Sequence, residues 1–137
     1  MTGKIKGKTL HINETLVKDF YNSFKNKDLV YDRFCQDNIE WITMDGMPNG
    51  GTYIGLKSVF DEYFPNMLSN FQEFYTNPSE FLCIDDQVIV FGSYSGQTKK
   101  GTSFIVPFCH VYRIKDSKIS QFKQFTDTEI IHEAMKS

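Results

Sequence analysis

The chain has 137 residues, of which 40% are hydrophobic and 23% are charged, and its formal net charge is −2 at pH 7. This length and composition indicate one folded, soluble domain around a single core, and they exclude a disordered chain. The small net charge gives no general attraction to nucleic acid or to anionic lipid, and no stretch reaches the ~18 apolar residues that a membrane span needs.

The N-terminus reads MTGKIKGK, in which lysines are spaced by small or apolar residues. Such a terminus is typical of a solvated, mobile tail, so we expect residues 1–12 to form a tail and residues 13–137 to form the single domain. No apolar core of a signal peptide is present. The three cysteines, Cys35, Cys83 and Cys109, are widely spaced and odd in number, which predicts reduced thiols and a cytoplasmic location.

Helical periodicity dominates the start of the chain. A 3.6-residue spacing predicts a first helix that has Asn13 as its N-cap and carries Leu16, Val17, Phe20, Tyr21 and Phe24. Asp28 can cap a short second helix, and a strand follows from Asn38 to Thr43. After the loop MDGMPNGG, a third helix past Gly55 is predicted to present one apolar face made of Val59, Phe60, Tyr63, Phe64 and Met67.

The second half of the chain changes to strand patterns. The segment FQEFYTNPSEFLCI predicts one long strand interrupted at Pro78, and QVIVFGSYSGQT predicts a second strand that KKG turns back. TSFIVPFCHVYRI and KISQFKQFT predict a hairpin around KDSK, and TEIIHEAMK predicts a short C-terminal helix with capping-box spacing between Thr126 and Glu129. Helices followed by antiparallel strands predict an α+β fold, in which helices cover one face of a curved sheet and enclose a hollow suited to a ligand.

Several of these motifs resemble the superfamily that includes nuclear transport factor two, ketosteroid isomerase and the SnoaL-type polyketide cyclases. The motifs are DNIEW, GTYIGLKSVFDEYF, FGSYSG, HVYRIKDSKI and QFTDT, which together cover roughly residues 13–135, and the nearest likeness is to the SnoaL-like group. The resemblance implies a cone-shaped, curved, mixed but mainly antiparallel sheet with N-terminal helices on its concave face and a short C-terminal helix. It also implies a cavity for a small molecule inside the cone.

The resemblance does not carry the catalytic residues of these enzymes onto this chain. Ketosteroid isomerases use an Asp on the first strand, a Tyr on the first helix and a protonated Asp on the penultimate strand, where this sequence has Thr43, Phe20 and Cys109. SnoaL-type cyclases use an acidic residue on the last strand, for which the match is Gln124, a side chain that hydrogen-bonds but cannot take a proton. Steroid isomerase chemistry is therefore not expected, although the pocket is.

The final hairpin decides which side chains face the cavity. A tight turn at Asp116 and Ser117 places Cys109 opposite Gln124, on the face that the isomerase likeness assigns to the cavity, and leaves His110 on the outer face. A loop one residue longer instead pairs His110 with Gln124. Because Ser117 is poorer than glycine in a tight turn, this second register stays open.

The candidate polar residues have both structural and functional interpretations. Gln124, Cys109 and Thr43 are the first candidates for polarising a ligand or moving its proton, with His110 and Asp127 in reserve. Cys109 is alternatively a small buried hydrophobe, and Asp127 is alternatively a helix cap. No spacing of His, Cys or Asp indicates a metal site, and we expect no cofactor. The side chains expected to line the ligand pocket are Phe20, Phe24, Trp41, Tyr53, Phe64, Tyr94, Val111 and Phe122.

Two functions stay open on the sequence alone. One is a protein that binds a small, largely apolar or aromatic molecule in the pocket, with undetermined activity. The other is an isomerase, cyclase or hydrolase-type enzyme that uses proton transfer or polarisation in the same cavity. Neither nucleic acid nor a membrane is expected as a partner. A homodimer is expected through apolar residues assigned to the outer sheet face, which are Ile89, Phe91, Phe104, Val106, Phe108, Tyr112 and Phe125.

Overall fold

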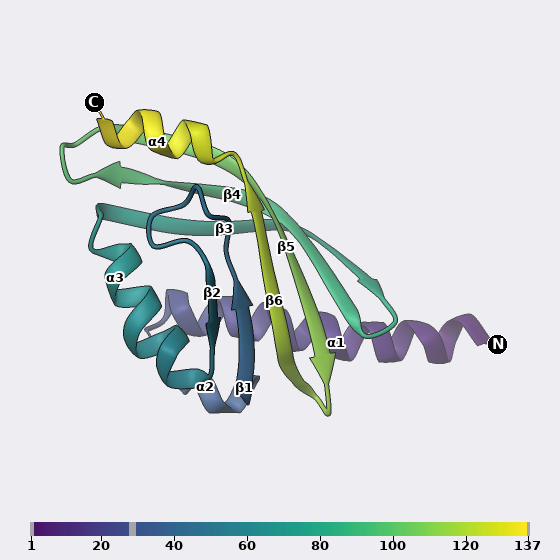
Figure 1. Ribbon diagram of the computed structural model, residues 1–137. Coiled ribbons are helices and arrows are strands. Elements are labelled where there is room, and N and C mark those ends of the chain that lie inside the picture. The colour runs from purple at the N-terminus through teal and green to yellow at the C-terminus, as the bar shows by residue number, and fades with distance from the viewer. Residues whose placement is uncertain (1, 28–29, 137) are drawn as a thin grey trace.

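The computed structural model of the protein describes residues 2–27 and 30–136, with side chains from residue 12 onward. In this part of the chain, one strongly curved sheet contains six strands in the order β2-β1-β6-β5-β4-β3 (Figure 1). Neighbouring strands are antiparallel except β1 and β6, which run parallel. The strands are β1 (Cys35–Ile42), β2 (Thr52–Ile54), β3 (Phe71–Ile84), β4 (Gln87–Thr98), β5 (Ser103–Lys115) and β6 (Lys118–Thr126).

Helices pack on the concave side of this sheet and close one end of it (Figure 1). They are α1 (Thr2–Lys25), α2 (Tyr31–Phe34), the π-type helix η1 (Lys57–Tyr63), which continues into α3 (Phe64–Leu68), and α4 (Thr128–Lys136). This is the cone-shaped α+β architecture that the sequence predicted. Of the helices described, none combines the length and the apolar character needed to cross a membrane.

The helix boundaries differ from prediction at the start of the chain. α1 begins at Thr2, so Asn13 lies inside the helix and is not its N-cap. The predicted cap Asp28 lies outside the described residues. The third helix has its predicted apolar face, with Val59, Phe60, Tyr63 and Met67 buried. Strand β2 was not predicted, because three residues between glycines show too little alternation to be recognised.

The tight turn of the final hairpin forms as predicted. Asp116 and Ser117 both have positive φ, 51° and 64°, as a two-residue type I′ turn requires. On either side of this turn Ile114 pairs with Ile119, which is also the predicted pair.

A β-bulge directly after that pair makes the predicted register wrong. β6 contains one extra residue, Ser120, whose hydroxyl donates to the carbonyl of Arg113 at 3.2 Å. All pairs beyond the bulge are displaced by one residue, so Gln124 pairs with His110 and not with Cys109. The second register considered above is therefore the one that forms, although the bulge produces it and not a longer loop.

The faces of β5 are consequently the reverse of the prediction. The even-numbered residues from Phe104 to Ile114 are buried on the concave face, and the odd-numbered ones lie on the outer face. Four residues predicted for the outer row belong instead to the core: Phe104, Val106, Phe108 and Tyr112. The apolar side chains that the outer face of β4, β5 and β6 does carry, which we call the outer patch, are Ile89, Phe91, Ile105, Cys109, Val111 and Phe125.

Candidate functional site

Four polar side chains from four different elements meet inside the cone. Tyr21 comes from α1, Tyr94 from β4, His110 from β5 and Gln124 from β6. The Tyr21 hydroxyl lies 2.7 Å from Nδ1 of His110, and the Tyr94 hydroxyl contacts Nε2 of the same ring. The Gln124 amide donates to the Tyr94 hydroxyl at 2.8 Å. These contacts form one continuous hydrogen-bonded chain, which we call the polar chain.

Burial keeps the polar chain uncharged. His110, Tyr94 and Gln124 are only 3%, 4% and 5% exposed. Burial lowers the pKa of His110 well below its usual 6.5, because the imidazolium would lose its hydration, and the ring is therefore neutral at pH 7. Burial raises the pKa of Tyr94 well above 10, which outweighs the lowering by the Gln124 hydrogen bond. The pKa of Tyr21 is raised by burial in the same way, although its hydrogen bond with Tyr112 partly opposes the effect.

Aromatic rings enclose the polar chain. Phe108 stacks on His110 with ring centres 3.9 Å apart and planes at 12°, and Phe122 meets His110 edge-on at 4.7 Å. Trp41 stacks on Phe122 at 3.8 Å. Gly92 on β4 makes room for Phe108, because a Cβ at this position would lie 2.6 Å from Cζ of that ring. In such surroundings a polar atom without a partner is costly, so the pairing within the polar chain matters for stability.

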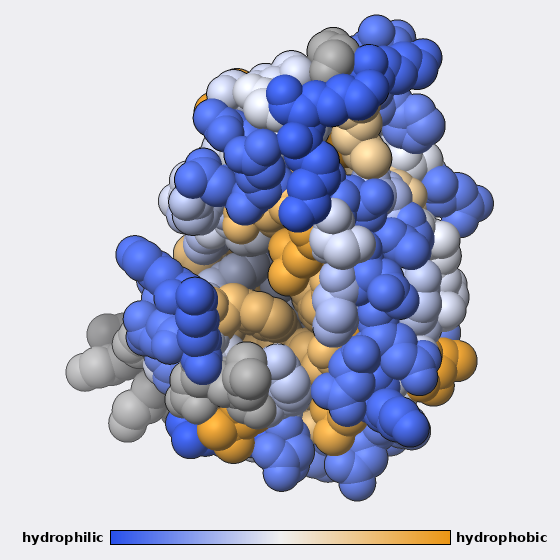
Figure 2. All heavy atoms as spheres, turned by 90° about the vertical axis from the view of Figure 1, so that its left-hand side faces the viewer, coloured by the Kyte–Doolittle hydropathy of each residue, from blue (hydrophilic) through white to orange (hydrophobic). Residues whose placement is uncertain are grey.

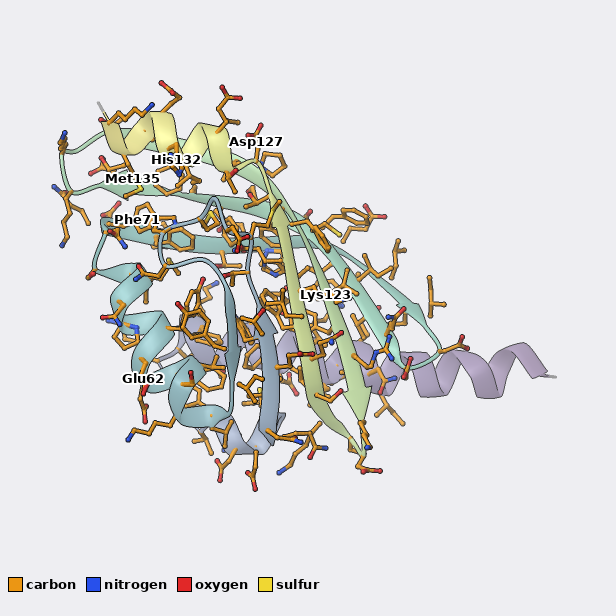
Figure 3. All side chains as sticks on the ribbon, viewed as in Figure 1. Glu62, Phe71, Lys123, Asp127, His132 and Met135 are labelled. Atoms are coloured by element: carbon orange, nitrogen blue, oxygen red, sulfur yellow. The ribbon has the colours of Figure 1, made fainter. Side chains whose placement is uncertain are left out.

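A recess of about 210 Å³ opens at the α4 end of the cone. Its lining residues are Met47, Pro48, His132, Met135 and Lys136. Figure 2 shows this end of the molecule hollowed, with hydrophobic residues deep inside and hydrophilic side chains around them. In Figure 3, His132 and Met135 lie at the same end as Phe71, the first residue of β3.

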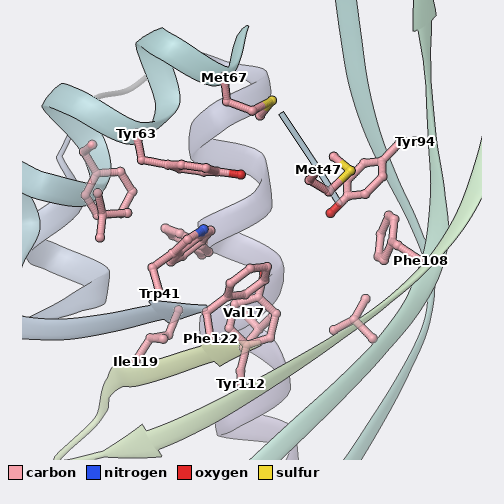
Figure 4. Packing of buried hydrophobic residues seen from close by; sticks show 14 of the residues in the cluster. Val17, Trp41, Met47, Tyr63, Met67, Tyr94, Phe108, Tyr112, Ile119 and Phe122 are labelled. Carbon is pink, nitrogen blue, oxygen red and sulfur yellow. The ribbon is translucent and has the colours of Figure 1, made fainter. Parts of the chain in front are cut away.

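Met47 connects the recess to the polar chain. Its side chain is 3% exposed, and Figure 4 shows it beside Tyr94. The hydroxyl of Tyr94 points toward that of Tyr63 across the interior, with Met67 nearby (Figure 4). Met47 thus borders both the recess and the interior, and its flexible thioether is a side chain that can move without a large change in the fold.

Hydrogen bonds hold the loop that carries Met47. Oγ1 of Thr43 donates to the carbonyl of Gly51 at 3.1 Å and accepts from the N–H of Gly51 at 3.0 Å. Oε1 of Gln124 accepts from the N–H of Met44 at 3.4 Å. Thr43, a candidate for ligand chemistry in the sequence, therefore has its hydroxyl engaged with the loop backbone.

The other predicted polar candidates lie in different parts of the structure, two in the interior and two outside it. Gln124 faces the interior and His110, held in reserve, lies at the centre of the polar chain. Cys109 is half-buried on the outer face, and burial raises its thiol pKa above the usual 9, so little thiolate is present at neutral pH. Asp127 is exposed, and its Oδ1 accepts from the N–H of Ile130 at 3.4 Å, which is the helix-cap role.

Most of the side chains predicted to line the pocket lie on the concave side. Phe20, Trp41, Tyr94 and Phe122 are buried there, and Phe24 and Phe64 pack together with ring centres 5.1 Å apart. Tyr53 donates its hydroxyl to the carbonyl of Asn49 in the loop at 2.6 Å. Val111 faces outward, opposite Lys123, because the inward residues of β5 are the even-numbered ones; its prediction as an inward residue is wrong.

Two residues of the site were not identified from the sequence. Tyr21 follows Phe20 on the apolar face of the first helix, and this position could have indicated that its side chain faces the interior. Met47 lies in a glycine-rich loop that has no periodicity, so nothing in the sequence indicated that its side chain is buried.

Solved structures with this architecture define the class of the protein. An NTF2-like protein from Burkholderia thailandensis is 29% identical, with a TM-score of 0.84 over 91% of this chain and 98% of that one. An NTF2-like protein of unknown function from Burkholderia pseudomallei is 23% identical, with a TM-score of 0.85 over 92% and 98%. TerC, co-crystallised with polyporic acid, is 24% identical, with a TM-score of 0.84 over 92% and 99%. The protein has the NTF2-like fold.

The family follows from the sequence match. The sequence model of the SnoaL-like domain matches residues 17–122, and the chain belongs to this family, as its motifs predicted. A search of curated proteins gave no match.

Proposed function

We propose that the protein binds a small, largely apolar or aromatic molecule inside the cone, with a polar atom of that molecule against the polar chain. The observation that carries this proposal is the polar chain itself, enclosed by Phe108, Phe122 and Trp41. A core that served packing alone would gain more from apolar side chains, because each buried polar group must be desolvated and paired. Ligand sites commonly have this composition, mainly apolar with a few convergent polar groups.

The electrostatics of the interior support a ligand without a strong charge. Among the described residues, the buried polar side chains other than tyrosines are Ser23, Thr43, Thr98, His110 and Gln124, and no lysine or arginine is buried. A charged ligand group would therefore lose its hydration without gaining an opposite charge. A neutral aromatic molecule with one or two hydrogen-bonding groups suits this interior better.

The recess at the α4 end provides a route for the ligand. It is separated from Tyr94 by the flexible side chain of Met47, and displacement of this side chain would extend the recess toward the hydroxyl of Tyr94. TerC supports a small-molecule role for the fold, since that protein was co-crystallised with polyporic acid.

The binding proposal is tested by native mass spectrometry of the purified protein and by a thermal-shift screen of small aromatic molecules. We expect a ligand whose affinity falls roughly tenfold in Tyr94→Phe, because one hydrogen bond to the ligand is lost. Tyr75→Phe is the matched control, since it removes an exposed tyrosine hydroxyl on β3. Equal loss in both variants, or no binding by any aromatic molecule, would contradict the proposal.

A second candidate function is proton-transfer catalysis in the same cavity. It is favoured by the neutral ring of His110, which lies between two hydroxyl groups and is able to accept a proton. Cys109 and Asp127 are poorer candidates for this role because both lie away from the interior. A His110→Gln variant that still binds the ligand but no longer converts it would support catalysis, whereas unchanged turnover would exclude this role for His110.

We also propose a homodimer in the cytoplasm. The outer patch leaves Ile105, Phe125 and Phe91 69%, 49% and 39% exposed on one face of the sheet, which supports association with a second copy. The cysteines are free thiols, as expected in a reducing compartment.

A further inference from the structure

A neutral imidazole limits how the polar chain shares its hydrogens. One ring nitrogen of His110 carries a hydrogen and donates, whereas the other accepts. Both nitrogens face a tyrosine hydroxyl: Nδ1 faces Tyr21 at 2.7 Å, and Nε2 faces Tyr94. One hydroxyl therefore donates to the ring while the other accepts from it. The accepting hydroxyl keeps its own hydrogen, which has no acceptor on the ring.

Burial decides which tyrosine keeps this spare hydrogen in the protein alone. With the ring hydrogen on Nδ1, Tyr94 donates to Nε2, its oxygen accepts from Gln124, and the spare hydrogen belongs to Tyr21. With the ring hydrogen on Nε2, the spare hydrogen belongs to Tyr94. The spare hydrogen of Tyr21 can be accepted by the oxygen of Tyr112, its hydrogen-bond neighbour, and Tyr21 is only half-buried, whereas Tyr94 is 4% exposed and shielded from water. Because a buried donor without an acceptor is costly, the ligand-free protein favours the Nδ1–H form.

We propose that a ligand acceptor oxygen placed against Tyr94 switches His110 to the Nε2–H form, so that Tyr94 donates its hydrogen to the ligand. In that form Nε2–H donates to the oxygen of Tyr94, and Tyr21 donates to Nδ1, so the ring hydrogen and both tyrosine hydroxyl hydrogens have acceptors. Both forms are neutral. The ring loses one hydrogen at Nδ1 and gains one at Nε2, and no net proton is exchanged with solvent.

This inference rests on the proposed binding function and names the ligand chemistry that the site recognises. Tyr94 is the residue that contacts the ligand, and His110 and Tyr21 are positioning residues. The ligand class is a mainly apolar molecule that carries a carbonyl or similar acceptor oxygen. In the Nδ1–H form the oxygen of Tyr94 retains a free lone pair, so the same site can face a ligand hydroxyl without any change in net charge.

Long-range ¹H–¹⁵N correlation spectra of protein with ¹⁵N-labelled histidine report which ring nitrogen carries the hydrogen. The probes are acetophenone and α-methylstyrene, in which a methylene group replaces the carbonyl oxygen. We expect the Nδ1–H form of His110 without a probe and with α-methylstyrene, and the Nε2–H form with saturating acetophenone. The variant His110→Gln assigns the signals by their disappearance.

Affinity provides the second readout. Acetophenone should bind about threefold to tenfold tighter than α-methylstyrene, the effect of one hydrogen bond, and Tyr94→Phe should make the two affinities equal. Tyr75→Phe should preserve the difference. An Nε2–H or doubly protonated ring in the ligand-free protein overturns the switch, and so does acetophenone binding without a change at His110. If neither probe binds, the proposed function is contradicted and the switch with it. If the probes bind but His110 does not change, only the switch is contradicted, so the two failures are distinguishable.

Discussion

His110 should couple the stability of the protein to pH. Because burial holds its pKa well below the usual 6.5, the unfolded chain takes up a proton at this residue in a pH range where the folded protein does not. Above about pH 6.5 His110 is neutral in both states, and the free energy of unfolding is not reduced by its titration. As the pH falls from there toward the lower pKa of the folded state, proton uptake by the unfolded chain makes the folded protein progressively less stable. Over this pH range, the free energy of unfolding measured by urea denaturation should fall by up to about 1.4 kcal/mol for each unit by which the pH is lowered, because of His110.

Two variants isolate this effect. His110→Phe should flatten the pH dependence, although its stability at pH 7 will be lower because Tyr21 and Tyr94 lose their shared partner. His132→Gln changes an exposed histidine on α4 and should keep the parent slope. A His110→Phe protein with the parent slope would show that His110 does not titrate at a depressed pKa.

Gln124 should contribute to the stability of the loop that carries Met47 as well as to the polar chain. Gln124→Leu removes the hydrogen bond to Tyr94 at 2.8 Å and leaves the N–H of Met44 without its side-chain acceptor. We expect the free energy of unfolding to fall by roughly 1–3 kcal/mol, measured by urea denaturation at pH 7. Gln72→Leu is the control, because Gln72 is exposed, and its effect should stay within about 0.5 kcal/mol. Equal effects would contradict a structural role for the buried amide.

At the scale of elements, the bulge at Ser120 should be removable without a change of register. Ile119 and Phe122 both face the core although they are three residues apart, which is possible because Ser120 is the extra residue between them. Deletion of Ser120 restores strict alternation and keeps Gln124 opposite His110. We expect a folded protein that loses about 1 kcal/mol, the contribution of the hydrogen bond from Ser120 to Arg113.

Deletion of Lys123 is the matched control in the same strand. It moves Gln124 and all later residues of β6 to the opposite face, which places Phe125 in the interior and removes the partner of Tyr94. This variant should fail to fold or should lose the amide pattern of the sheet in NMR spectra. If the Ser120 deletion behaved in the same way, the bulge would be essential to the fold.

The hairpin also shows how far the sequence could predict the site. The turn was predictable because its length and flanking isoleucines specify it, and the fold class followed from the order of helices and strands. The bulge was not predictable, because any polar residue near the turn can supply the extra position. One displaced residue was enough to exchange Cys109 for His110 in the interior. Gln124 was nevertheless identified, because the family resemblance pointed to its position on the last strand, and most of the aromatic wall was predicted as well.

For the whole molecule, we expect a dimer of two chains at micromolar concentration. The substitutions Ile105→Glu and Phe125→Glu together introduce charges into the outer patch and should yield monomers in light scattering, because a buried unpaired charge is strongly unfavourable. Ile12→Glu is the control, since Ile12 is 64% exposed on α1, outside the outer patch. A parent protein that is strictly monomeric at this concentration would contradict the proposed assembly.

The parallel pairing of β1 with β6 has a consequence for biosynthesis. Glu40 and Gln121 hydrogen-bond at 2.6 Å although 81 residues separate them, and the stacked pair of Trp41 and Phe122 is equally distant in sequence. β3 to β6 can assemble as successive hairpins while the chain emerges from the ribosome, but β1 has no neighbour on this side until β6 has been made. Trp41 therefore lacks its stacking partner Phe122, and β1 lacks this neighbouring strand, until β6 has been translated as far as Thr126.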